Sequence, residues 1–334
     1  MSLRPDPFRQ AAREFLLTAV RGPGGRGADP TAVPVTAPAA VVAEPVVGAA
    51  LDPAVRPVCA IHPGALPSTV WQGLAARLSE DSAPYVCDLG TVPAYFAAGL
   101  DPTAPVAGVG ELAALCLAEL TAAGLTERPF TLVGWSFGGV VAYEIAARLD
   151  ARGLGDTLEA LVVLDSIAPI AAFARAEEEL EPARLLDWFA MYLGARRGRR
   201  LTVDPRAFEG RRVEEDGLGV LLDTAVAQGV LPADTGEAGL RKLFGAFRAG
   251  LVRNTRCTAG YLPDPLDRTV TVVKPERSLL PESPDLGWSQ LSGRPLVRLD
   301  VPGDHYTLLQ EPRTVAALAA LLDGPAHTTA PRTG

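Results

Sequence analysis

The sequence predicts an α/β fold, with a mostly parallel, twisted sheet covered by helices on both faces. Short apolar runs alternate with helical patterns along most of the chain, as is typical of parallel strands that are buried on both sides. The composition agrees, because 334 residues with 48% apolar and 21% charged content can bury a full hydrophobic core.

The N-terminal part of the chain differs from the rest. Residues 1–22 are predicted to form an amphipathic helix, since Asp6-Pro7 can begin it and apolar residues follow at helical spacing. Residues 23–45, rich in Pro, Ala, Val and Gly, predict an extended linker. We expect the globular domain to span residues 46–325 and residues 326–334 to be a disordered tail.

Strands and helices alternate through this domain. Apolar, β-branched runs predict strands at 45–51, 57–61, 84–89, 130–134, 160–165, 270–274 and 295–301. Periodic apolar stripes predict helices at 68–79, 109–123, 139–149 and 312–322.

One stretch interrupts the alternation. Between Ser166 and Tyr261 the sequence has helical patterns at 182–192, 217–228 and 239–254 but no predicted strand. A helical insertion of this size between two strands of a sheet predicts a lid, spanning about 170–260.

The bulk chemistry excludes several classes of function. A net charge of −8 argues against non-specific nucleic-acid binding, which needs a basic surface. The sequence has no signal peptide and no apolar stretch suited to span a membrane, so we expect a soluble cytoplasmic protein. The cysteines lie far apart without a CxxC pair, which predicts free thiols rather than disulfides or a metal site: Cys59, Cys87, Cys116 and Cys257.

The strongest motif is Gly134-Trp135-Ser136-Phe137-Gly138. A G-x-S-x-G between an apolar strand and a helix is typical of a nucleophile turn, and both flanking elements are predicted here. The glycines have no Cβ to clash where strand and helix nearly touch. The helix N-terminus brings backbone N–H groups next to Ser136, so the motif predicts this serine as nucleophile and Phe137 as an oxyanion donor.

A serine nucleophile needs a base, and the chain has three histidines. His327 lies in the polar tail, and His62 precedes the serine. His305 follows the last predicted strand and precedes the last helix, where the order serine, acid, histidine puts the base. This order predicts His305 as the base.

Three carboxylates are candidates for the acid that orients this imidazole. Asp165 ends the strand after the nucleophile, and Glu276 follows the next strand along the chain. Asp304 is adjacent to His305 and would point away from it in an extended loop. Position favours Asp165 but leaves Glu276 as a rival.

A second oxyanion donor is expected from the loop after an early strand, at residues 59–65. Pro63 has no N–H, so either Gly64 or Ala65 must donate. His62 could brace this loop or simply pack in the core.

Taken as a set, these motifs resemble the type I thioesterase domains of polyketide synthases and nonribosomal peptide synthetases, members of the α/β-hydrolase superfamily. The resemblance covers roughly Val46 to Leu322. The shared features are Ile61-His62-Pro63, the serine motif with Gly139, Leu164-Asp165-Ser166, a helical lid, Leu286-Gly287-Trp288 and Gly303-Asp304-His305-Tyr306.

The resemblance implies roles for the site residues. It selects Asp165 over Glu276 as the acid and assigns the oxyanion donors to Phe137 and Gly64. The family usually has a residue such as Ala after His-Pro and then glycines, whereas this chain has Gly64-Ala65, so Ala65 stays a candidate donor.

The resemblance also implies an activity: release of an acyl, polyketide or peptidyl chain from the phosphopantetheine thioester of a carrier protein. An acyl-Ser136 intermediate would then be resolved by hydrolysis or macrocyclisation, without a bound cofactor or metal. No phosphopantetheine attachment motif precedes the domain, so we expect a free-standing relative acting in trans. The alternatives are a carboxylesterase or lipase with the same triad, and a catalytically silent binding protein.

Two further features concern partners. The N-terminal helix is similar to helices that dimerise polyketide thioesterases, so a homodimer is one expectation and packing on its own domain the other. The basic residues Arg196, Arg197, Arg199 and Arg200 are a candidate docking site for an acidic carrier protein, or else a solvated loop. Apolar residues of the lid predict an acyl channel or helix core: Leu185, Trp188, Phe189, Tyr192, Leu243, Phe244 and Phe247.

Overall fold

The computed structural model describes residues 43–45, 55–173 and 181–324. The helix predicted within residues 1–22, most of the predicted linker and the tail at 326–334 lie outside these residues, as does His327. Among the described residues, no helix combines the length and apolarity that crossing a membrane requires.

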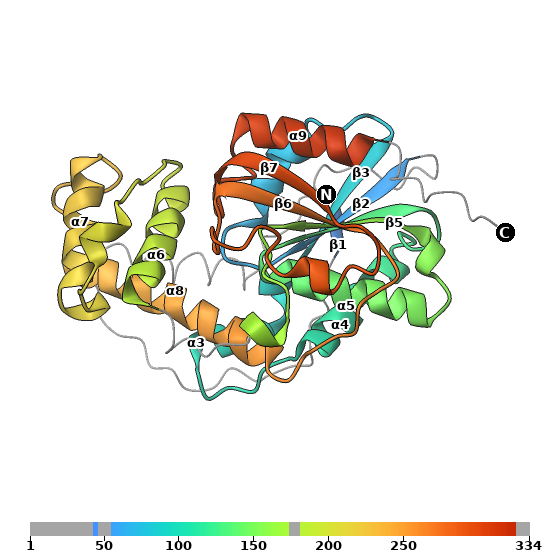
Figure 1. Cartoon of the computed structure of the whole chain (residues 1–334), viewed down its shortest axis with the longest axis horizontal. Coiled ribbons are helices and arrows are strands. Elements are labelled where there is room, and N and C mark those ends of the chain that lie inside the picture. The colour runs from blue at the N-terminus through green and yellow to red at the C-terminus, as the bar shows by residue number, and fades with distance from the viewer. Residues whose placement is uncertain (1–42, 46–54, 174–180, 325–334) are drawn as a thin grey trace, which may run out of the picture. The chain divides into compact units, whose positions relative to one another are not determined.

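In the described part of the chain, seven strands form one sheet in the order β1-β3-β2-β4-β5-β6-β7, and all neighbouring pairs except β1 with β3 are parallel (Figure 1). This confirms the predicted fold class. The strands are β1 (Ala43–Pro45), β2 (Arg56–His62), β3 (Ser82–Asp88), β4 (Phe130–Trp135), β5 (Leu158–Leu164), β6 (Val270–Arg277) and β7 (Val297–Asp304).

Strand β1 falls at the end of the predicted linker, and most of the strand predicted at 45–51 lies outside the described residues. The six parallel strands each overlap a predicted one. Strand β4 is buried along its whole length, as its largely apolar sequence predicts.

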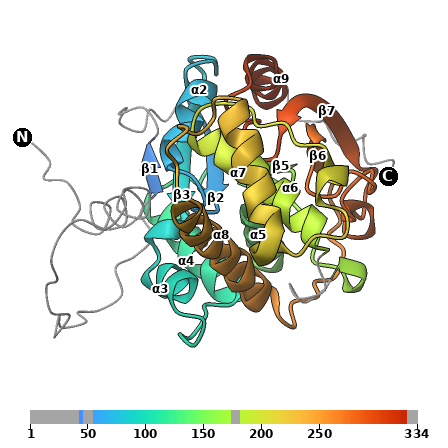
Figure 2. The same ribbon diagram turned by 90° about the vertical axis from the view of Figure 1, so that its left-hand side faces the viewer.

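Helices cover both faces of the sheet. Figures 1 and 2 show α4 and α5 on one face and α2 and α9 on the other. The helices outside the insertion are α2 (Gln72–Ala75), α3 (Pro93–Leu100), α4 (Val109–Ala122), α5 (Phe137–Ala151) and α9 (Pro312–Asp323). The helix predicted at 68–79 is shorter than expected, a 3₁₀ turn at Ser68–Trp71 followed by α2. Helix α3 is an addition to the prediction, and Pro93 occupies its first turn.

Between β5 and β6 the described chain is helical, which confirms the predicted insertion. Its helices are α6 (Pro182–Arg196), α7 (Leu218–Ala227) and α8 (Glu237–Thr258). Residues 181–251 belong to one compact unit, and the sheet with its helices forms another, which includes the last turns of α8.

The insertion has its own aromatic core, formed by α6 and α8. Phe189 packs edge-on against Phe244 with ring centroids 5.1 Å apart, and Tyr192 packs against Phe247 at 5.2 Å. All four rings are buried. In this structure these residues therefore serve as helix core, one of the two expectations from the sequence.

Candidate active site

Parallel strands bring their carboxyl ends to one edge of a sheet, and the predicted site residues lie at that edge. Ser136 directly follows β4, Asp165 directly follows β5, and His305 directly follows β7. Because β4 pairs with β5 and β5 with β6, the first two residues leave neighbouring strands.

The turn at Ser136 has a backbone conformation that few residues other than glycine adopt, with φ 54° and ψ −129°. Its glycines are required by close backbone contacts. A Cβ on Gly134 would lie 2.4 Å from Gly139 Cα, and one on Gly138 would lie 2.2 Å from the carbonyl oxygen of Ile61. The Ser136 N–H donates to Leu164 O at 2.9 Å, which fixes the turn to β5.

The predicted acid and base are in direct contact. His305 Nδ1 and Asp165 Oδ2 are 2.8 Å apart, and both side chains are buried, at 1% and 0% exposure. Since the carboxylate only accepts hydrogen bonds, the Nδ1 proton lies between them and Nε2 is left as the basic nitrogen. Glu276, the rival acid, is exposed near the end of β6, so the structure pairs His305 with Asp165.

Asp165 receives two more hydrogen bonds from the segment that follows β6. The Ser278 hydroxyl donates to Oδ1 at 2.5 Å, and the Leu279 N–H donates to Oδ2 at 3.1 Å. Asp165 itself has φ 40°, an uncommon conformation for a residue with a side chain. Three donors therefore hold a buried carboxylate in one orientation.

Asp304 has a different role from its neighbour His305. Its Oδ1 accepts the N–H groups of Tyr306 and Thr307, both at 3.0 Å, and so forms the turn that carries the imidazole. The sequence expectation that Asp304 does not pair with His305 agrees with these contacts.

Trp135 connects the Ser136 turn to His305. Its indole Nε1 donates to the carbonyl oxygen of His305 at 3.0 Å, and its ring lies 5.9 Å from the imidazole, centroid to centroid. Among the described residues, the Ser136 hydroxyl makes no hydrogen bond, with His305 or with any other group. In the absence of substrate, hydrogen bonds between a catalytic serine and histidine are often long or poorly aligned, and they tighten when substrate binds.

The loop after β2 carries the candidate oxyanion donors. Gly64 has φ 77°, and a Cβ at this position would lie 2.9 Å from Gly90 Cα, so both its conformation and its surroundings require glycine. Gly64 and Ala65 are exposed. Within the described part of the chain, the N–H groups of Gly64, Ala65 and Phe137 donate to no protein acceptor, so all three stay available to a ligand.

His62 braces this loop. Its Nε2 donates to Leu66 O at 2.6 Å, and its Nδ1 accepts from Trp71 Nε1 at 3.2 Å. Trp71 can only donate, so His62 is the neutral tautomer with its proton on Nε2. Burial lowers the pKa of His62 below its ordinary value, which agrees with a neutral ring.

Three residues with roles in this geometry were not singled out from the sequence: Trp135, Ser278 and Tyr95, whose hydroxyl lies 3.0 Å from the carbonyl oxygen of Pro63 in the loop after β2. Trp135 occupies the variable position of the serine motif, where any residue satisfies the pattern. Ser278 lies in a segment without a motif, and Tyr95 lies on a helix that was not predicted. Proline at the start of α3 was the one available signal.

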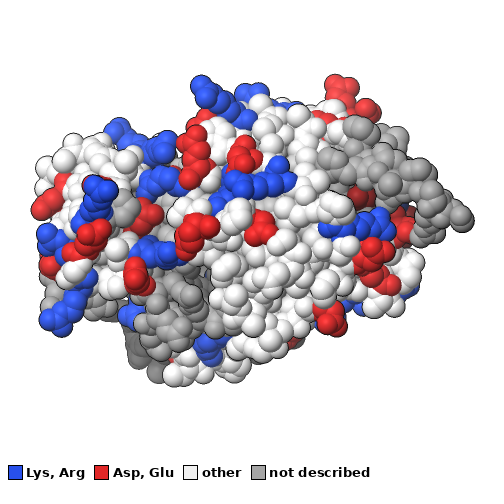
Figure 3. Space-filling model, in the orientation of Figure 1, with Lys and Arg blue, Asp and Glu red and all other residues white. Residues whose placement is uncertain are grey.

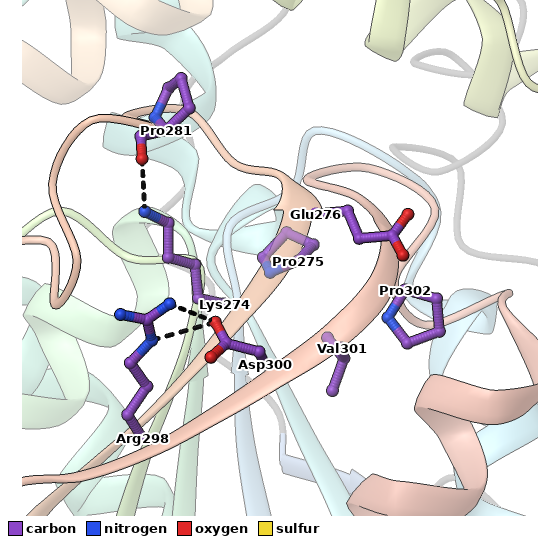
Figure 4. Close-up of a pocket in the computed structure, with 8 residues that line it drawn as sticks. All are labelled: Lys274, Pro275, Glu276, Pro281, Arg298, Asp300, Val301 and Pro302. Carbon is purple, nitrogen blue, oxygen red and sulfur yellow. Dashed lines mark hydrogen bonds and ion pairs between the residues drawn. The ribbon is translucent and has the colours of Figure 1, made fainter.

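A pocket of about 390 Å³ lies beside β6 and β7 and is lined by Lys274, Pro275, Glu276, Pro281, Arg298, Asp300, Val301 and Pro302 (Figure 4). Two of its charged groups are already paired, since Arg298 Nε and Nη2 donate to Asp300 Oδ1 at 2.9 and 2.6 Å. Lys274 Nζ donates to the carbonyl oxygens of Leu280 and Pro281 at 3.0 and 3.1 Å. Lys274 thus holds the segment that carries Ser278, and the pocket contains none of the predicted triad.

The remaining sulfur and metal chemistry is limited. All four cysteines are buried free thiols, and burial raises the pKa of Cys257 to about 11, far from the thiolate form. In residues 43–45, 55–173 and 181–324, no group of His, Cys, Asp and Glu side chains is arranged to hold a metal ion.

Known proteins show similarity to this chain in sequence and in structure. Orsellinic acid synthase ArmB of Armillaria ostoyae is 28% identical over 204 residues, which are 60% of this chain and 8% of that protein. A four-domain nonribosomal peptide synthetase, holo-AB3403, bound to AMP and glycine, superposes with a TM-score of 0.53 at 27% identity, covering 80% of this chain and 19% of that one. RedJ with a PEG molecule in its active site has a TM-score of 0.51 at 23% identity, with 88% and 98% covered, and shows the shared fold.

The chain therefore spans under a tenth of the length of the orsellinic acid synthases that it matches. The sequence profile described as "Thioesterase domain" matches residues 56–322, which include every residue of the candidate site. The fold, the strand-end positions of the site residues and this match agree with the resemblance stated above. This chain belongs to the thioesterase domain family.

Proposed function

We propose that this protein is a serine thioesterase that releases an acyl, polyketide or peptidyl chain from the phosphopantetheine thioester of a carrier protein. The observation that carries the proposal is the buried contact of 2.8 Å between Asp165 and His305, at the same sheet edge as the strained Ser136 turn. Membership of the thioesterase family favours thioesters over oxygen esters as substrates.

The first half of the proposed cycle forms an acyl-enzyme. His305 Nε2 accepts the Ser136 proton while the serine oxygen attacks the thioester carbonyl carbon. The N–H groups of Phe137 and Gly64, or Ala65 in place of Gly64, stabilise the oxyanion that forms. The carbon–sulfur bond then breaks, the phosphopantetheine sulfur takes the proton from His305, and the acyl group stays on Ser136 as an ester.

The second half frees the enzyme. A water molecule gives up a proton to His305 and attacks the ester, which yields a free acid, or a hydroxyl or amine of the acyl chain attacks and yields a macrocycle. In both cases the proton returns from His305 to Ser136 as the ester bond breaks. Asp165 stabilises the imidazolium in each half, and no metal or bound cofactor takes part in the proposed cycle.

The partner in this proposal is an acyl or peptidyl carrier protein. The similarity to part of a four-domain nonribosomal peptide synthetase, 19% of that chain, supports a substrate that is presented on a carrier. For docking, the exposed Arg197 and Arg200 are the cleaner candidates in the basic cluster. Arg196 and Arg199 already donate within the insertion, to Tyr192 Oη at 2.9 Å and Gly229 O at 3.0 Å.

The face drawn in Figure 3 has basic and acidic side chains interspersed, so on this face a local cluster rather than a broad basic surface would have to attract the carrier. Reversal of the charge at Arg197 and Arg200 should then raise KM for a carrier-bound substrate and spare a small thioester. Equal effects on both substrates would contradict docking at these two arginines without contradicting the proposed thioesterase activity.

The activity is tested by comparing kcat/KM for an acyl N-acetylcysteamine thioester with that for an oxygen ester of the same acyl group. We expect a preference for the thioester, labelling of Ser136 by a fluorophosphonate, and loss of both turnover and labelling in Ser136→Ala. A preference for the oxygen ester would favour an esterase. Failure of the wild-type protein to label and to turn over either ester would favour a binding module.

A further inference from the structure

Tyr95, on α3, contacts both of the segments that carry candidate oxyanion donors. Its hydroxyl lies 3.0 Å from the carbonyl oxygen of Pro63, and its ring is stacked on Phe137 with centroids 5.7 Å apart and planes at 9°. The side chain is buried, with 0% exposure. A buried tyrosine does more than fill space in the core, because its hydroxyl needs hydrogen-bond partners in specific positions.

Two residues of α8 surround the same hydroxyl. Arg253 Nη2 donates to Tyr95 Oη at 2.8 Å, and the guanidinium carbon lies 3.6 Å from the centre of the Tyr95 ring. Asn254 Oδ1 lies 2.8 Å from the hydroxyl and also accepts from Arg253 Nε and Nη2, at 3.2 and 3.0 Å. The cation over the ring and the hydrogen bond to Oη together hold Tyr95 in one rotamer.

The single hydroxyl proton has two possible acceptors. Asn254 Oδ1 already receives two hydrogen bonds from Arg253. The buried carbonyl of Pro63 has Tyr95 as its one donor among the described residues. A buried carbonyl without a donor costs about 1–3 kcal/mol, so the Tyr95 proton belongs on Pro63.

The carbonyl of Pro63 and the N–H of Gly64 belong to the same planar peptide group. In a trans peptide these two bonds point in opposite directions, so a group that fixes the carbonyl also fixes the direction of the N–H. The Gly64 N–H donates to no described acceptor, and Gly64 is packed against Gly90 on its other side. The Tyr95 hydroxyl therefore determines where this N–H is aimed.

We infer that Tyr95, held by Arg253, is a positioning residue that aims the Gly64 N–H at the oxyanion and aligns it with Phe137. The inference rests on the proposed function and selects Gly64 rather than Ala65 as the second donor. Tyr95 acts through the peptide group and touches no reacting atom.

Tyr95→Phe tests this inference, because it removes the hydroxyl and keeps the ring against Phe137 and Arg253. We expect kcat for an N-acetylcysteamine thioester to fall about 5- to 10-fold, the effect of one hydrogen bond lost in the transition state, with KM little changed. The matched control is Tyr143→Phe. Tyr143 is equally buried, and its hydroxyl lies 2.9 and 2.8 Å from the carbonyl oxygens of Asp264 and Leu291, away from the loop.

Two readouts separate positioning from a general loss of structure. A trifluoromethyl ketone analogue forms a tetrahedral oxyanion on Ser136. Its inhibition constant should therefore rise in Tyr95→Phe by the factor by which kcat falls, and should stay unchanged in Tyr143→Phe. Hydrogen exchange of a peptide covering residues 60–70 should be faster in Tyr95→Phe, since the Gly64 peptide loses its anchor.

Unchanged ketone inhibition and unchanged exchange in a folded Tyr95→Phe protein would overturn the inference, as would an equal loss in Tyr143→Phe. Absence of turnover and of fluorophosphonate labelling in the wild-type protein would instead refute the proposed function. The exchange measurement would then decide by itself whether Tyr95 holds the loop.

Discussion

Asp165 and His305 are held by hydrogen bonds to their own side-chain atoms, whereas Gly64 and Phe137 are held through their neighbours. The carboxylate receives three donors and the pair is fully buried. The loop that carries Gly64 is exposed at its tip. It is held by hydrogen bonds to the residues on either side of Gly64 and Ala65: the His62 imidazole donates to Leu66 O, and the Tyr95 hydroxyl donates to Pro63 O.

This difference agrees with the roles proposed for the two groups of residues, the acid–base pair and the oxyanion donors. An acid–base pair needs a defined proton position, and buried charge-assisted hydrogen bonds supply it. An oxyanion site needs N–H groups that are unsatisfied until the transition state forms, so they cannot be fixed by hydrogen bonds of their own. Their direction has to be set from the other end of the peptide group or by packing.

The comparison predicts the largest effect for the acid. Asp165→Asn should reduce kcat/KM about 10,000-fold with the fold intact, because the amide cannot stabilise the imidazolium and favours the wrong tautomer. Glu276→Gln is the matched control, since it makes the same chemical change at the exposed rival carboxylate. Steady-state kinetics on the thioester measure both. Similar losses in the two variants would mean that the acid is not Asp165 alone.

Gly64→Ala should have the next largest effect. The new Cβ meets Gly90 Cα at 2.9 Å in a conformation with φ 77°, so the loop must move and one oxyanion donor is displaced. We expect kcat to fall about 100-fold or more, the loss found when such a donor is removed.

Gly153→Ala provides the control for backbone strain in this prediction. Gly153 has φ 71° but no atom within 4 Å of a built Cβ. This variant should lose about 1 kcal/mol of stability and retain kcat. An unchanged kcat in Gly64→Ala would exclude this loop from the oxyanion site.

Ser278→Ala addresses the second contact of Asp165. The loss of a 2.5 Å hydrogen bond to a buried carboxylate should lower kcat/KM about 10-fold, which corresponds to the lower part of the range for charged partners. Ser278→Thr keeps the hydroxyl and should restore most of the activity. Ser292→Ala removes another hydroxyl, bonded to Arg294 O near the opposite end of β6, and should leave kcat/KM unchanged.

The Asp165–His305 pair and the Gly64 loop also differ in how far the sequence predicts them. Ser136, Asp165 and His305 each directly follow a strand of the parallel sheet, and strand ends can be inferred from apolar runs. Six parallel strands, the helices behind them and the helical insertion were predicted for the same reason. The order of residues along the chain then brings acid and base to one edge of the sheet.

The contacts that hold the Gly64 loop could not be predicted in this way. Tyr95 and Arg253 are 158 positions apart and meet only through the packing of α3 against the end of α8. Neither has a motif, and α3 itself was not predicted. Contacts between surfaces of different elements depend on side-chain packing, which periodicity does not encode. Ser278 was missed for the same reason, although Asp165 was found.

The smallest effect expected is a pH dependence of stability caused by His62. Burial lowers its pKa in the folded protein below the ordinary value of 6.5, which the unfolded chain retains. Between the folded and unfolded pKa values the unfolded chain binds more protons, so the free energy of unfolding is largest above pH 6.5 and decreases as the pH falls below it. His62→Gln cannot titrate, while its amide can still donate to Leu66 O.

Urea unfolding at pH 7.5 and pH 5.5 tests this contribution as a difference between wild type and His62→Gln. The difference between the two proteins reports on residue 62, so the wild type should lose more stability on acidification than the variant. If both lose the same amount, the imidazole is not kept neutral by its place between Trp71 and Leu66. His62 would then be protonated as readily in the folded protein as in the unfolded chain. The Gly64 loop would depend on Tyr95 and on the packing of Gly64 against Gly90.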